Sequence, residues 1–499
     1  MALAITLGRA EYGIQAPLVT IETHLANGLP AFSIVGLAET AVKESRDRVR
    51  SAIVNSGFEF PARRITVNLA PADLPKHGGR FDLPIALGIL AASGQVPADD
   101  LERVELAGEL SLGGRLRGVS GILPAAVQAR AANRELILAE PNAGEASLVH
   151  PNGCRAASHL LEVCGHFAGE NPLPVTPHSR IEPSPSNAPD LADVRGQSRA
   201  RRALEIAAAG RHNLLLAGPP GTGKSMLAAR LAGILPTMSE VERLETASVH
   251  SLSHEGFAAS RWGWRPFRAP HHSASHVALA GGGRQPRPGE ISLAHNGVLF
   301  LDELPEFSRQ SLEILREPLE CGEVTISRAA NQVIYPARFQ LIAAMNPCPC
   351  GFLGDPVENC RCAPEQISRY RSRLSGPLLD RIDLHVEVNR LPAEALQDAS
   401  PAEPSNTVAE RVRAAYQRRM TQSGKPSADL GAKQLESACA LGPAETQFAR
   451  GALEQMRLSA RGYHRLLRVA RTIADLGGEA RVSTESLSEA LSYRRLPMS

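Results

Sequence analysis

The sequence predicts an α/β protein in three parts: a mixed α+β first part, a central α/β part and a helical bundle at the end. An apolar run at 214–217 enters a glycine-rich loop and then a good helix-forming segment, which is the pattern of a strand, a turn and a helix. Two later apolar runs, 298–301 and 339–345, each end in polar residues, as buried parallel strands do. The segments 453–475 and 484–493 have helical periodicity.

Two segments divide the chain into these parts. Residues 169–189 are rich in proline, serine and asparagine, which is typical of a linker. Residues 391–406 contain three prolines and separate the middle from the end. The predicted domains are therefore 1–168, 190–390 and 405–499.

The first domain mixes short strands with helices. Residues 65–69 alternate as a half-buried strand, residues 39–55 have an amphipathic helical pattern, and residues 83–92 are apolar enough for a buried helix. These elements predict an α+β layer arrangement.

Length and composition set limits on the kind of protein. A chain of 499 residues is too long for one core, and 43% hydrophobic with 21% charged residues predicts a mostly folded protein. The net charge of +2 neither demands nor excludes a nucleic-acid partner. Nearly all positive charge is arginine, which suits bidentate phosphate recognition, although a biased base composition would produce the same excess.

The start of the chain, the length of its apolar runs and its cysteines favour a soluble, cytoplasmic protein. The start lacks the basic-then-apolar layout of a signal peptide, and no apolar run approaches the ~20 residues that span a bilayer. Eight cysteines in this length are not a secreted disulfide framework, and half of them lie in one short segment.

The glycine-rich loop is the strongest functional signal. Between a strand and a helix, its backbone N–H groups would cradle a triphosphate, a lysine would reach the β- and γ-phosphates, and a hydroxyl would bind Mg²⁺. The alternative is an ordinary strand-to-helix turn. The loop consists of Gly218, Pro219, Pro220, Gly221, Thr222, Gly223, Lys224 and Ser225.

The other apolar runs supply groups for hydrolysis. Asp302 would hold Mg²⁺ through its water shell, and Glu303 would polarise the attacking water. An amide at Asn346 would orient that water or contact the γ-phosphate. Taken alone, residues 298–303 favour this function modestly over a buried strand that ends in a solvated acidic turn, and the phosphate loop about eighty residues upstream strengthens the functional interpretation.

Phosphoryl transfer needs an extra cation on the transferred group, and a neighbouring subunit often supplies it. Arg381 is the candidate for that cation. The alternative role for Arg381 is a salt bridge to Asp380 or Asp383 in the same subunit.

These residues resemble the AAA+ ATPases of the magnesium-chelatase type, and more narrowly the YifB/ComM proteins. The resemblance runs over essentially the whole chain, with its most specific motifs at 217–225, 268–272, 344–351 and 375–381. It implies binding of ATP and Mg²⁺ and a hexameric ring.

The resemblance also implies roles for single residues. Asn346 is similar to the sensor 1 residue and Arg381 to an arginine finger that acts in trans. Arg461, at the start of a C-terminal helix, looks like sensor 2, and Arg465 and Arg468 are rivals for that role.

Two segments suggest DNA as a partner. Residues 323–335 alternate as a β-hairpin with Arg328 near its polar tip, where AAA+ relatives carry a pore hairpin that grips nucleic-acid backbone. The alternative is a surface hairpin with a solvated arginine. Residues 261–287 interleave basic and aromatic side chains, which suits either stacking of unpaired bases or local packing. Within them His271 and His272 offer a weak metal hypothesis.

Four thiols lie within fifteen residues. Cys348, Cys350, Cys360 and Cys362 form two C-x-C pairs, a spacing tighter than the commoner zinc pattern. A structural Zn²⁺ is favoured over free buried thiols or a redox-labile pair.

Residues 75–84, which come before the apolar helix, and residues 108–116 resemble the Lon-protease-like fold, also known as the ribosomal S5 domain 2-like fold. Lon proteases use a serine–lysine pair, but this chain has Arg80 and Leu123 at those places, while Ser111 and Lys76 nearby form no recognisable pair. The resemblance therefore implies an inactive domain that assists assembly or holds a partner.

Together these features predict an ATP-driven ring motor on branched or single-stranded DNA, a helicase in recombination or natural transformation, as the YifB/ComM resemblance implies. A magnesium-chelatase-like metal-insertion or protein-remodelling ATPase and a regulatory nucleotide-binding protein are the alternatives.

Overall fold

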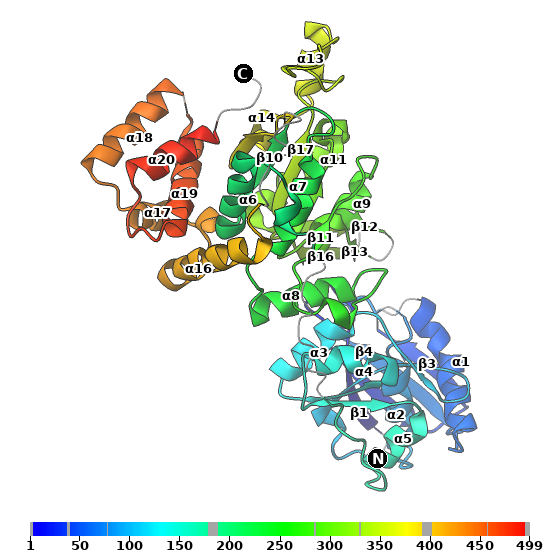
Figure 1. Ribbon diagram of the computed structural model, residues 1–499. Helices are drawn as coiled ribbons and strands as arrows, with labels where there is room; N and C mark the ends of the chain where they lie inside the picture. The colour runs from blue at the N-terminus through cyan, green and yellow to red at the C-terminus, as the bar shows by residue number, and fades with distance from the viewer. Residues whose placement is uncertain are drawn as a thin grey trace. The chain divides into compact units, whose positions relative to one another are not determined.

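The computed structural model describes residues 3–36, 40–76, 78–177, 188–283, 286–328, 331–391, 402–456 and 458–494, without the side chains of residues 40–42, 328 and 331. The contacts group the chain into two compact units, which Figure 1 colours along the sequence. Unit 1 consists of Met1–Ser184, Glu240–Trp262 and Ala329–Val333, and unit 2 of the remaining residues.

Unit 1 is built on a seven-stranded mixed sheet. Its strand order is β3-β4-β2-β1-β5-β8-β9, antiparallel at the β1–β2 and β2–β4 pairs and parallel elsewhere. The strands are β1 (Leu3–Arg9), β2 (Leu18–Ala26), β3 (Ala31–Val35), β4 (Arg64–Ala70), β5 (Val104–Ala107), β8 (Glu135–Ala139) and β9 (Cys154–Ala157). The strand predicted at 65–69 is confirmed as β4.

Helices and one small hairpin complete this unit. The predicted helix at 83–92 is confirmed as α2, whose every residue is buried, and the predicted helix at 39–55 is α1, with residue 39 outside the described part. These elements are α1 (Thr40–Asn55), α2 (Asp82–Ala92), α3 (Ile122–Ala131), α4 (Ala143–Ser147), α5 (Leu160–Phe167), β6 (Glu109–Leu110) and β7 (Leu116–Arg117).

Helix α8 (Glu240–Ser251) belongs to unit 1 although it follows the phosphate loop in the sequence. Ala247 is buried in the apolar cluster around α3, with Leu244, Phe257 and Trp262 packed against it. Burial of these apolar side chains, and not sequence position, decides where the segment packs. The prediction had placed these residues inside the 190–390 domain, and the three-domain division stays a prediction.

Unit 2 contains a five-stranded parallel sheet in the order β11-β14-β17-β10-β18. Its strands are β10 (Leu214–Ala217), β11 (Phe267–Arg268), β14 (Val298–Leu301), β17 (Gln340–Met345) and β18 (Leu384–Glu387). All residues of β10, β14 and β17 are buried, as their apolar sequences predict. Because the strands are parallel, the loops after β10, β14 and β17 meet at one edge of the sheet.

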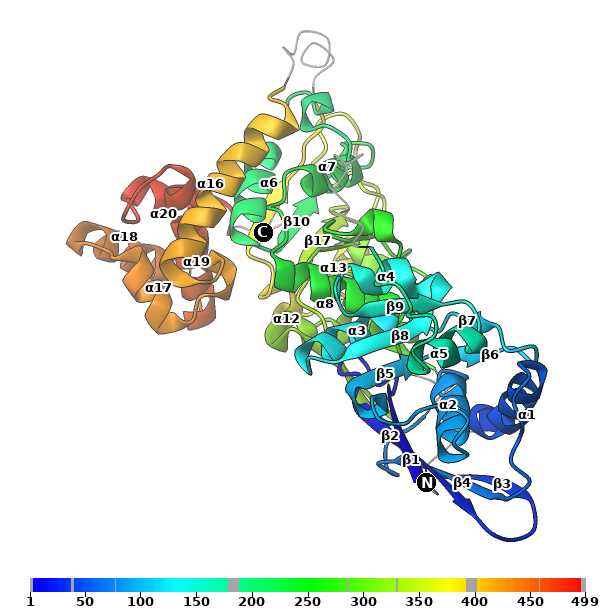
Figure 2. The same cartoon turned by 90° about the horizontal axis from the view of Figure 1, so that it is seen from below.

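Helices pack around this sheet, and further helices follow it along the chain as far as Ser492. Figure 2 shows α6 and α16 side by side, and α19 packs against both. The longer helices are α6 (Ser198–Gly210), α7 (Lys224–Arg230), α13 (Pro364–Arg371), α16 (Ser405–Ser423), α17 (Ala432–Cys439), α18 (Pro443–Gln455), α19 (Ala460–Leu476) and α20 (Thr484–Ser492). Short helices are α9 (His276–Ala280), α10 (Glu290–Leu293), α11 (Arg309–Ile314), α12 (Pro318–Cys321) and α14 (Gly376–Leu379).

The continuous helix predicted at 453–475 is wrong. Helix α18 ends at Gln455 and α19 begins at Ala460. Ser459 caps α19 by accepting a hydrogen bond from the N–H of Gly462, which starts a new helix where periodicity alone predicts continuation.

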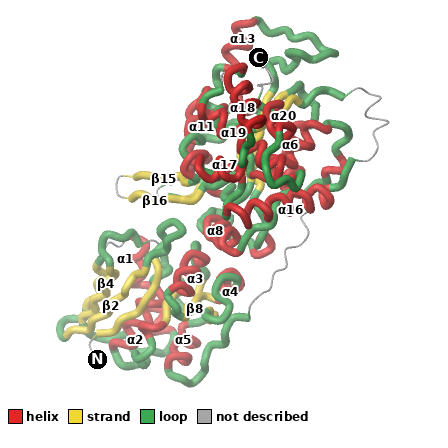
Figure 3. The backbone as a smooth tube through the Cα atoms, turned by 90° about the vertical axis from the view of Figure 1, so that its left-hand side faces the viewer, coloured by secondary structure: helices red, strands yellow, loops and turns green. Residues whose placement is uncertain are grey.

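The predicted hairpin is present as a two-stranded sheet of β15 (Glu323–Arg328) and β16 (Asn331–Pro336), seen as paired yellow arms in Figure 3. Residues 329 and 330 and the side chain of Arg328 lie outside the described part, so the Arg328 prediction is untouched by the structure. A second small pair, β12 (Gly281–Gly282) with β13 (Arg287–Pro288), lies in unit 2. Among the described helices, none has the length and apolar character to cross a membrane.

Candidate phosphate-binding site

The glycine-rich loop leaves β10 and enters α7, as predicted. Gly221 and Gly223 have φ values of 76° and 89°, which favour glycine. A Cβ on Gly218 would lie 2.1 Å from the carbonyl oxygen of Val388, so only glycine fits there without a shift of the backbone. The loop therefore needs its glycines for its shape.

Lys224 is a buried cation at the centre of this loop, with 8% of its surface exposed. Its Nζ donates to the carbonyl oxygens of Gly218 and Pro219, both at 2.7 Å, and to Oδ1 of Asn346 at 3.1 Å. Burial lowers the pKa of Lys224, while the negative charges of Asp302 and Glu303 oppose that shift. The structure thus brings the predicted lysine and amide into direct contact.

The predicted Mg²⁺ ligands also meet. The hydroxyl of Ser225 donates to Oδ2 of Asp302 at 2.5 Å, although the two residues are 77 positions apart. The other carboxylate oxygen of Asp302 accepts the N–H of Glu303 at 2.9 Å. Mg²⁺ prefers oxygen ligands, and a hydroxyl and a carboxylate this close together could both bind one ion. The two residues therefore suit a Mg²⁺ site.

A cavity of about 380 Å³ joins these groups. Its lining contains the phosphate loop and the ends of β14 and β17: Pro220, Gly221, Gly223, Lys224, Ser225, Met226, Asp302, Glu303, Met345 and Asn346. One cation, two carboxylates and an amide thus converge on a single space. That arrangement suits a polyphosphate with its counter-ion and a water molecule.

Glu303 has a strained backbone and a partner that the sequence did not reveal. Its φ of 52° is in the left-handed region, which is uncommon for a residue with a side chain. Its carboxylate Oε2 lies 3.2 Å from Nδ1 of His272. The rings of His271 and His272 lie against each other with centroids 4.1 Å apart. Among the described residues, the histidine pair is part of no group with metal-ligand geometry, so the structure does not support the weak metal hypothesis.

Asn346 has a second contact through its backbone. Its N–H faces the phenolic oxygen of Tyr370 in α13, and burial raises the pKa of that tyrosine. Asn346 therefore contacts Tyr370 of α13 through its backbone N–H and Lys224 through its side-chain oxygen, and the two contacts fix its position.

Arg381 does not line the cavity of its own subunit. Its guanidinium forms an ion pair with Glu320 and donates to the carbonyl oxygen of Pro377 at 2.8 Å. The intrasubunit alternative named Asp380 or Asp383 as partner, whereas the structure pairs the arginine with Glu320.

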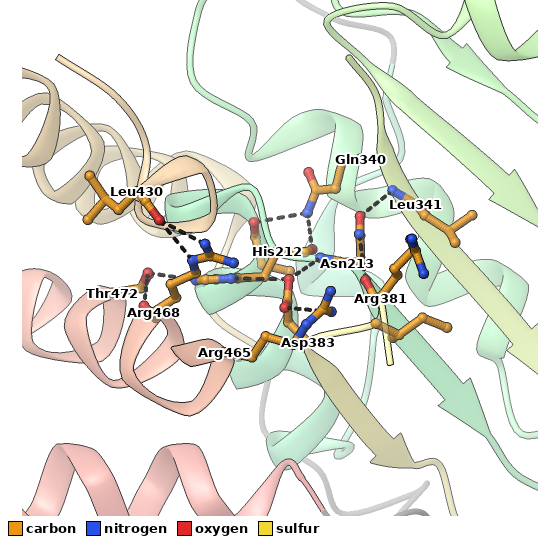
Figure 4. A network of polar contacts seen from close by, with 12 residues as sticks. His212, Asn213, Gln340, Leu341, Arg381, Asp383, Leu430, Arg465, Arg468 and Thr472 are labelled. Atoms are coloured by element: carbon orange, nitrogen blue, oxygen red, sulfur yellow. Dashed lines mark hydrogen bonds and ion pairs between the residues drawn. The ribbon is translucent and has the colours of Figure 1, made fainter. Parts of the chain in front are cut away.

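A polar network fixes the backbone at Arg381, as Figure 4 shows. Asn213 donates its side-chain amide to the Arg381 carbonyl oxygen at 2.8 Å. Asp383 lies 3.2 Å from Arg465 and 3.5 Å from His212. Burial alone would raise the pKa of Asp383, but the close contact with His212, the charge of Arg465 and the hydrogen bond from the N–H of Asn213 lower it to about 2. The network connects α19 to the start of β18.

The same network distinguishes the sensor 2 candidates. Arg465 is engaged with Asp383, and Arg468 donates to the carbonyl oxygen of Leu430 at 2.8 Å. Arg461 is exposed at the start of α19 and makes no hydrogen bond or ion pair with the described residues. Of the three, Arg461 has its guanidinium available to a ligand.

Two of the three aromatic side chains at 261–287 make packing contacts with other rings. Trp262 makes an edge contact with Phe257, centroids 6.2 Å apart, and Phe267 stacks on Phe300 at 6.0 Å. These contacts favour local packing over a stacking platform for bases.

The four clustered thiols converge. The sulfur atoms of Cys348, Cys350, Cys360 and Cys362 all lie within 4.8 Å of one another. Of the described residues, they form the one group with metal-ligand geometry, and all four are free cysteines.

The first domain shows no serine–lysine pair at the positions considered. Lys76 is buried and donates to the carbonyl oxygen of Pro71, whereas the Ser111 hydroxyl accepts the N–H of Arg115. Arg80 is buried and donates to the carbonyl oxygens of Arg9 and Ser120. These residues are structural.

Comparison with known proteins covers nearly the whole chain. Residues 190–396 match the family described as magnesium chelatase, subunit ChlI, residues 21–142 match subunit ChlI of Mg-chelatase, and residues 402–494 match the ChlI C-terminal family. The chain is 54% identical to the competence protein ComM of Haemophilus influenzae, over 99% of this chain and 98% of that protein. It is 53% identical to the protein YifB of Salmonella typhimurium over the same shares. The magnesium-chelatase 38 kDa subunit of Rhodobacter capsulatus is 26% identical over 45% of this chain and 67% of its own length.

Proposed function

Because the chain belongs to the YifB/ComM family of magnesium-chelatase-like proteins, we propose that it is an ATP-hydrolysing, ring-forming motor that acts on DNA. Its activity is helicase action or branch migration in recombination or natural transformation. The observation that carries the proposal is the convergence of Lys224, Ser225, Asp302 and Asn346 on one cavity that Glu303 also lines.

Each residue has a task in hydrolysis. Lys224 binds the β- and γ-phosphates after exchanging its carbonyl partners for phosphate oxygens. Glu303 accepts the proton of the attacking water, and Asn346 orients that water. The strained backbone and the contact with His272 fix where the Glu303 carboxylate lies.

The cofactors follow from the donor atoms. Ser225 and Asp302 would hold Mg²⁺, which neutralises phosphate charge when it is bound. The four thiols would hold a structural Zn²⁺, since a closed set of four thiolates leaves no open position for chemistry.

The ring is inferred from Arg381. As Arg381 does not line its own cavity, a role in hydrolysis requires that it reach the cavity of a neighbouring subunit. A closed ring of such head-to-tail contacts gives every cavity one arginine. We place Arg461 in the sensor 2 role, since its rivals are engaged elsewhere.

DNA is proposed as the substrate of the motor on two grounds. A relative of 54% identity is named a competence protein. The β15–β16 hairpin also lies at the place in the sequence where AAA+ relatives carry a pore hairpin that grips nucleic-acid backbone. Arg328 at the end of β15 is the proposed backbone contact. A metal-insertion ATPase is the second candidate, because the match to magnesium-chelatase subunits extends over the ATPase part of the chain.

The test measures ATP hydrolysis with and without forked or three-stranded DNA. We expect stimulation by DNA, its loss in Arg328→Ala, and its retention in Arg450→Ala, which removes an exposed arginine of α18. Hydrolysis that ignores DNA would refute the motor and favour the second candidate. Nucleotide binding without hydrolysis would favour a regulatory protein.

A mixing experiment tests the ring. Arg381→Ala and Glu303→Gln should each abolish hydrolysis alone. In mixed rings, the cavity of an Arg381→Ala subunit keeps Glu303 and receives Arg381 from its Glu303→Gln neighbour, so activity should return. Mixtures that stay inactive although they assemble would contradict action in trans.

A further inference from the structure

The four thiols have the geometry of a tetrahedral metal site. The sulfur of Cys348 lies 3.4 Å from that of Cys350 and 3.6 Å from that of Cys360, and Cys350 lies 3.6 Å from Cys360. A disulfide needs about 2.05 Å, so none of these pairs is bonded. Zinc–sulfur bonds of about 2.3 Å in a regular tetrahedron place the sulfurs about 3.8 Å apart, close to the observed spacing.

The backbone around the cluster also suits bound thiolates. The N–H of Cys350 points at the sulfur of Cys362 at 3.4 Å. Further N–H groups face the sulfurs of Cys348 and Cys350; they come from Gly351, Leu353, Phe352 and Arg361. Such donors orient thiolate ligands and offset their negative charge.

The cluster adjoins the phosphate loop. Gly351, directly after Cys350, has a φ of 89°, and a Cβ built on it would lie 2.6 Å from the ring of Pro220 and 3.9 Å from Cγ of Asn346. Cys348 comes two residues after Asn346, whose amide accepts the hydrogen bond of Lys224. Gly351 therefore packs against Pro220 and lies near Asn346, and both of these residues line the cavity.

We propose that the four thiols bind one Zn²⁺ and that its occupancy sets the efficiency of the nucleotide site, because the metal holds the turn 348–351 against Pro220 and beside Asn346. Without the metal, the four thiols keep the weak hydrogen bonds among their sulfurs and from nearby N–H groups, and these hold the two halves of the loop together less firmly than four metal–sulfur bonds. This inference rests on ATP hydrolysis at the cavity, as proposed above.

The first measurement is metal content of the full-length protein. We expect about one zinc per chain in the wild type and in Cys321→Ser, which removes an exposed cysteine outside the cluster, and nearly none in Cys360→Ser. Protein produced with Co²⁺ should show the sulfur-to-cobalt charge-transfer bands of a four-thiolate site. Near-zero metal in the wild type would overturn the site.

The second measurement tests the coupling. Cys360→Ser should weaken binding of a fluorescent ATP analogue or slow hydrolysis by roughly 10- to 100-fold, since small misplacements in such sites have effects of that size. Gly351→Ala should keep the zinc and still impair nucleotide binding, because its new methyl group displaces Pro220. Wild-type behaviour of zinc-free Cys360→Ser would overturn the coupling.

A chelator experiment covers the case in which Cys360→Ser fails to fold. A zinc-selective chelator, used with Mg²⁺ in excess, should remove the metal and the nucleotide affinity of the wild type together, and added zinc should restore both. Unchanged affinity after removal of zinc would refute the coupling. A protein that holds zinc and binds nucleotide tightly but never hydrolyses ATP would instead refute the proposed function.

Discussion

Glu145→Gln should stabilise unit 1 at neutral and alkaline pH. Glu145 lies in α4, where its carboxyl accepts hydrogen bonds from the hydroxyl of Ser251 and the N–H of Leu123. Burial raises the pKa of Glu145 from 4.5 to about 7, and those two hydrogen bonds oppose the shift only in part. A glutamine amide keeps an oxygen to accept the same bonds and carries no charge.

The size of the effect follows from the pKa. Between pH 4.5 and 7 the folded protein binds a proton at Glu145 that the unfolded chain has released, so stability falls as the pH rises through this window. The difference between 4.5 and about 7 corresponds to about 3 kcal/mol, since each pH unit is worth about 1.4 kcal/mol. Glutamine removes this penalty. Its advantage over glutamate should be small at pH 5 and nearly complete at pH 8.

Thermal unfolding of the full chain between pH 5 and pH 8 measures this advantage. About 2–3 kcal/mol in a unit of this size shifts the midpoint by roughly 5–10 °C. Glu140→Gln, on the exposed turn before α4, is the matched control and should show no pH-dependent shift. A constant difference between Glu145→Gln and the wild type across this range would refute the reasoning.

Three further outcomes are expected. Asp475→Asn should lower the free energy of unfolding by about 3–5 kcal/mol, because the guanidinium groups of Arg419 and Arg471 would stay buried without their shared carboxylate. A loss below about 1 kcal/mol in thermal unfolding would contradict this. Glu303→Gln should cut phosphate release at least about 100-fold, and retained hydrolysis would exclude Glu303 as the base. His272→Ala should lower kcat about tenfold with KM unchanged, because the base loses the group that orients it; a rise in KM alone would assign His272 to binding.

Much of the candidate site could be predicted because its signals are local. The phosphate loop lies between a strand and a helix, and Asp302 and Asn346 each follow an apolar run. Parallel strands end at the same edge of a sheet, so the contacts of Ser225 with Asp302 and of Lys224 with Asn346 follow from the strands themselves. The same locality explains why the buried helix α2 was predicted correctly.

The contacts that the sequence missed depend on tertiary packing. His272 is 31 residues before Glu303, and its motif shows two histidines but not the direction of either ring. Helix α8 follows the phosphate loop in the chain, yet its apolar side chains pack against α3, and no local pattern reveals which core they join. The break before α19 depends on one capping serine, a weaker signal than the periodicity on both sides.

The ion pair of Arg381 with Glu320 is compatible with a role in trans when its strength is considered. The side chain of Glu320 is 63% exposed and that of Arg381 is 11% exposed, so the carboxylate is solvated and water screens the attraction between the two charges. A nucleotide phosphate in a neighbouring cavity carries more charge and accepts a guanidinium in a bidentate manner. Exchange of Glu320 for phosphate therefore costs little, while the bond from Asn213 keeps the Arg381 backbone in place during the exchange. The pair thus holds the arginine in the single subunit and is compatible with the proposed use of Arg381 by a neighbouring one.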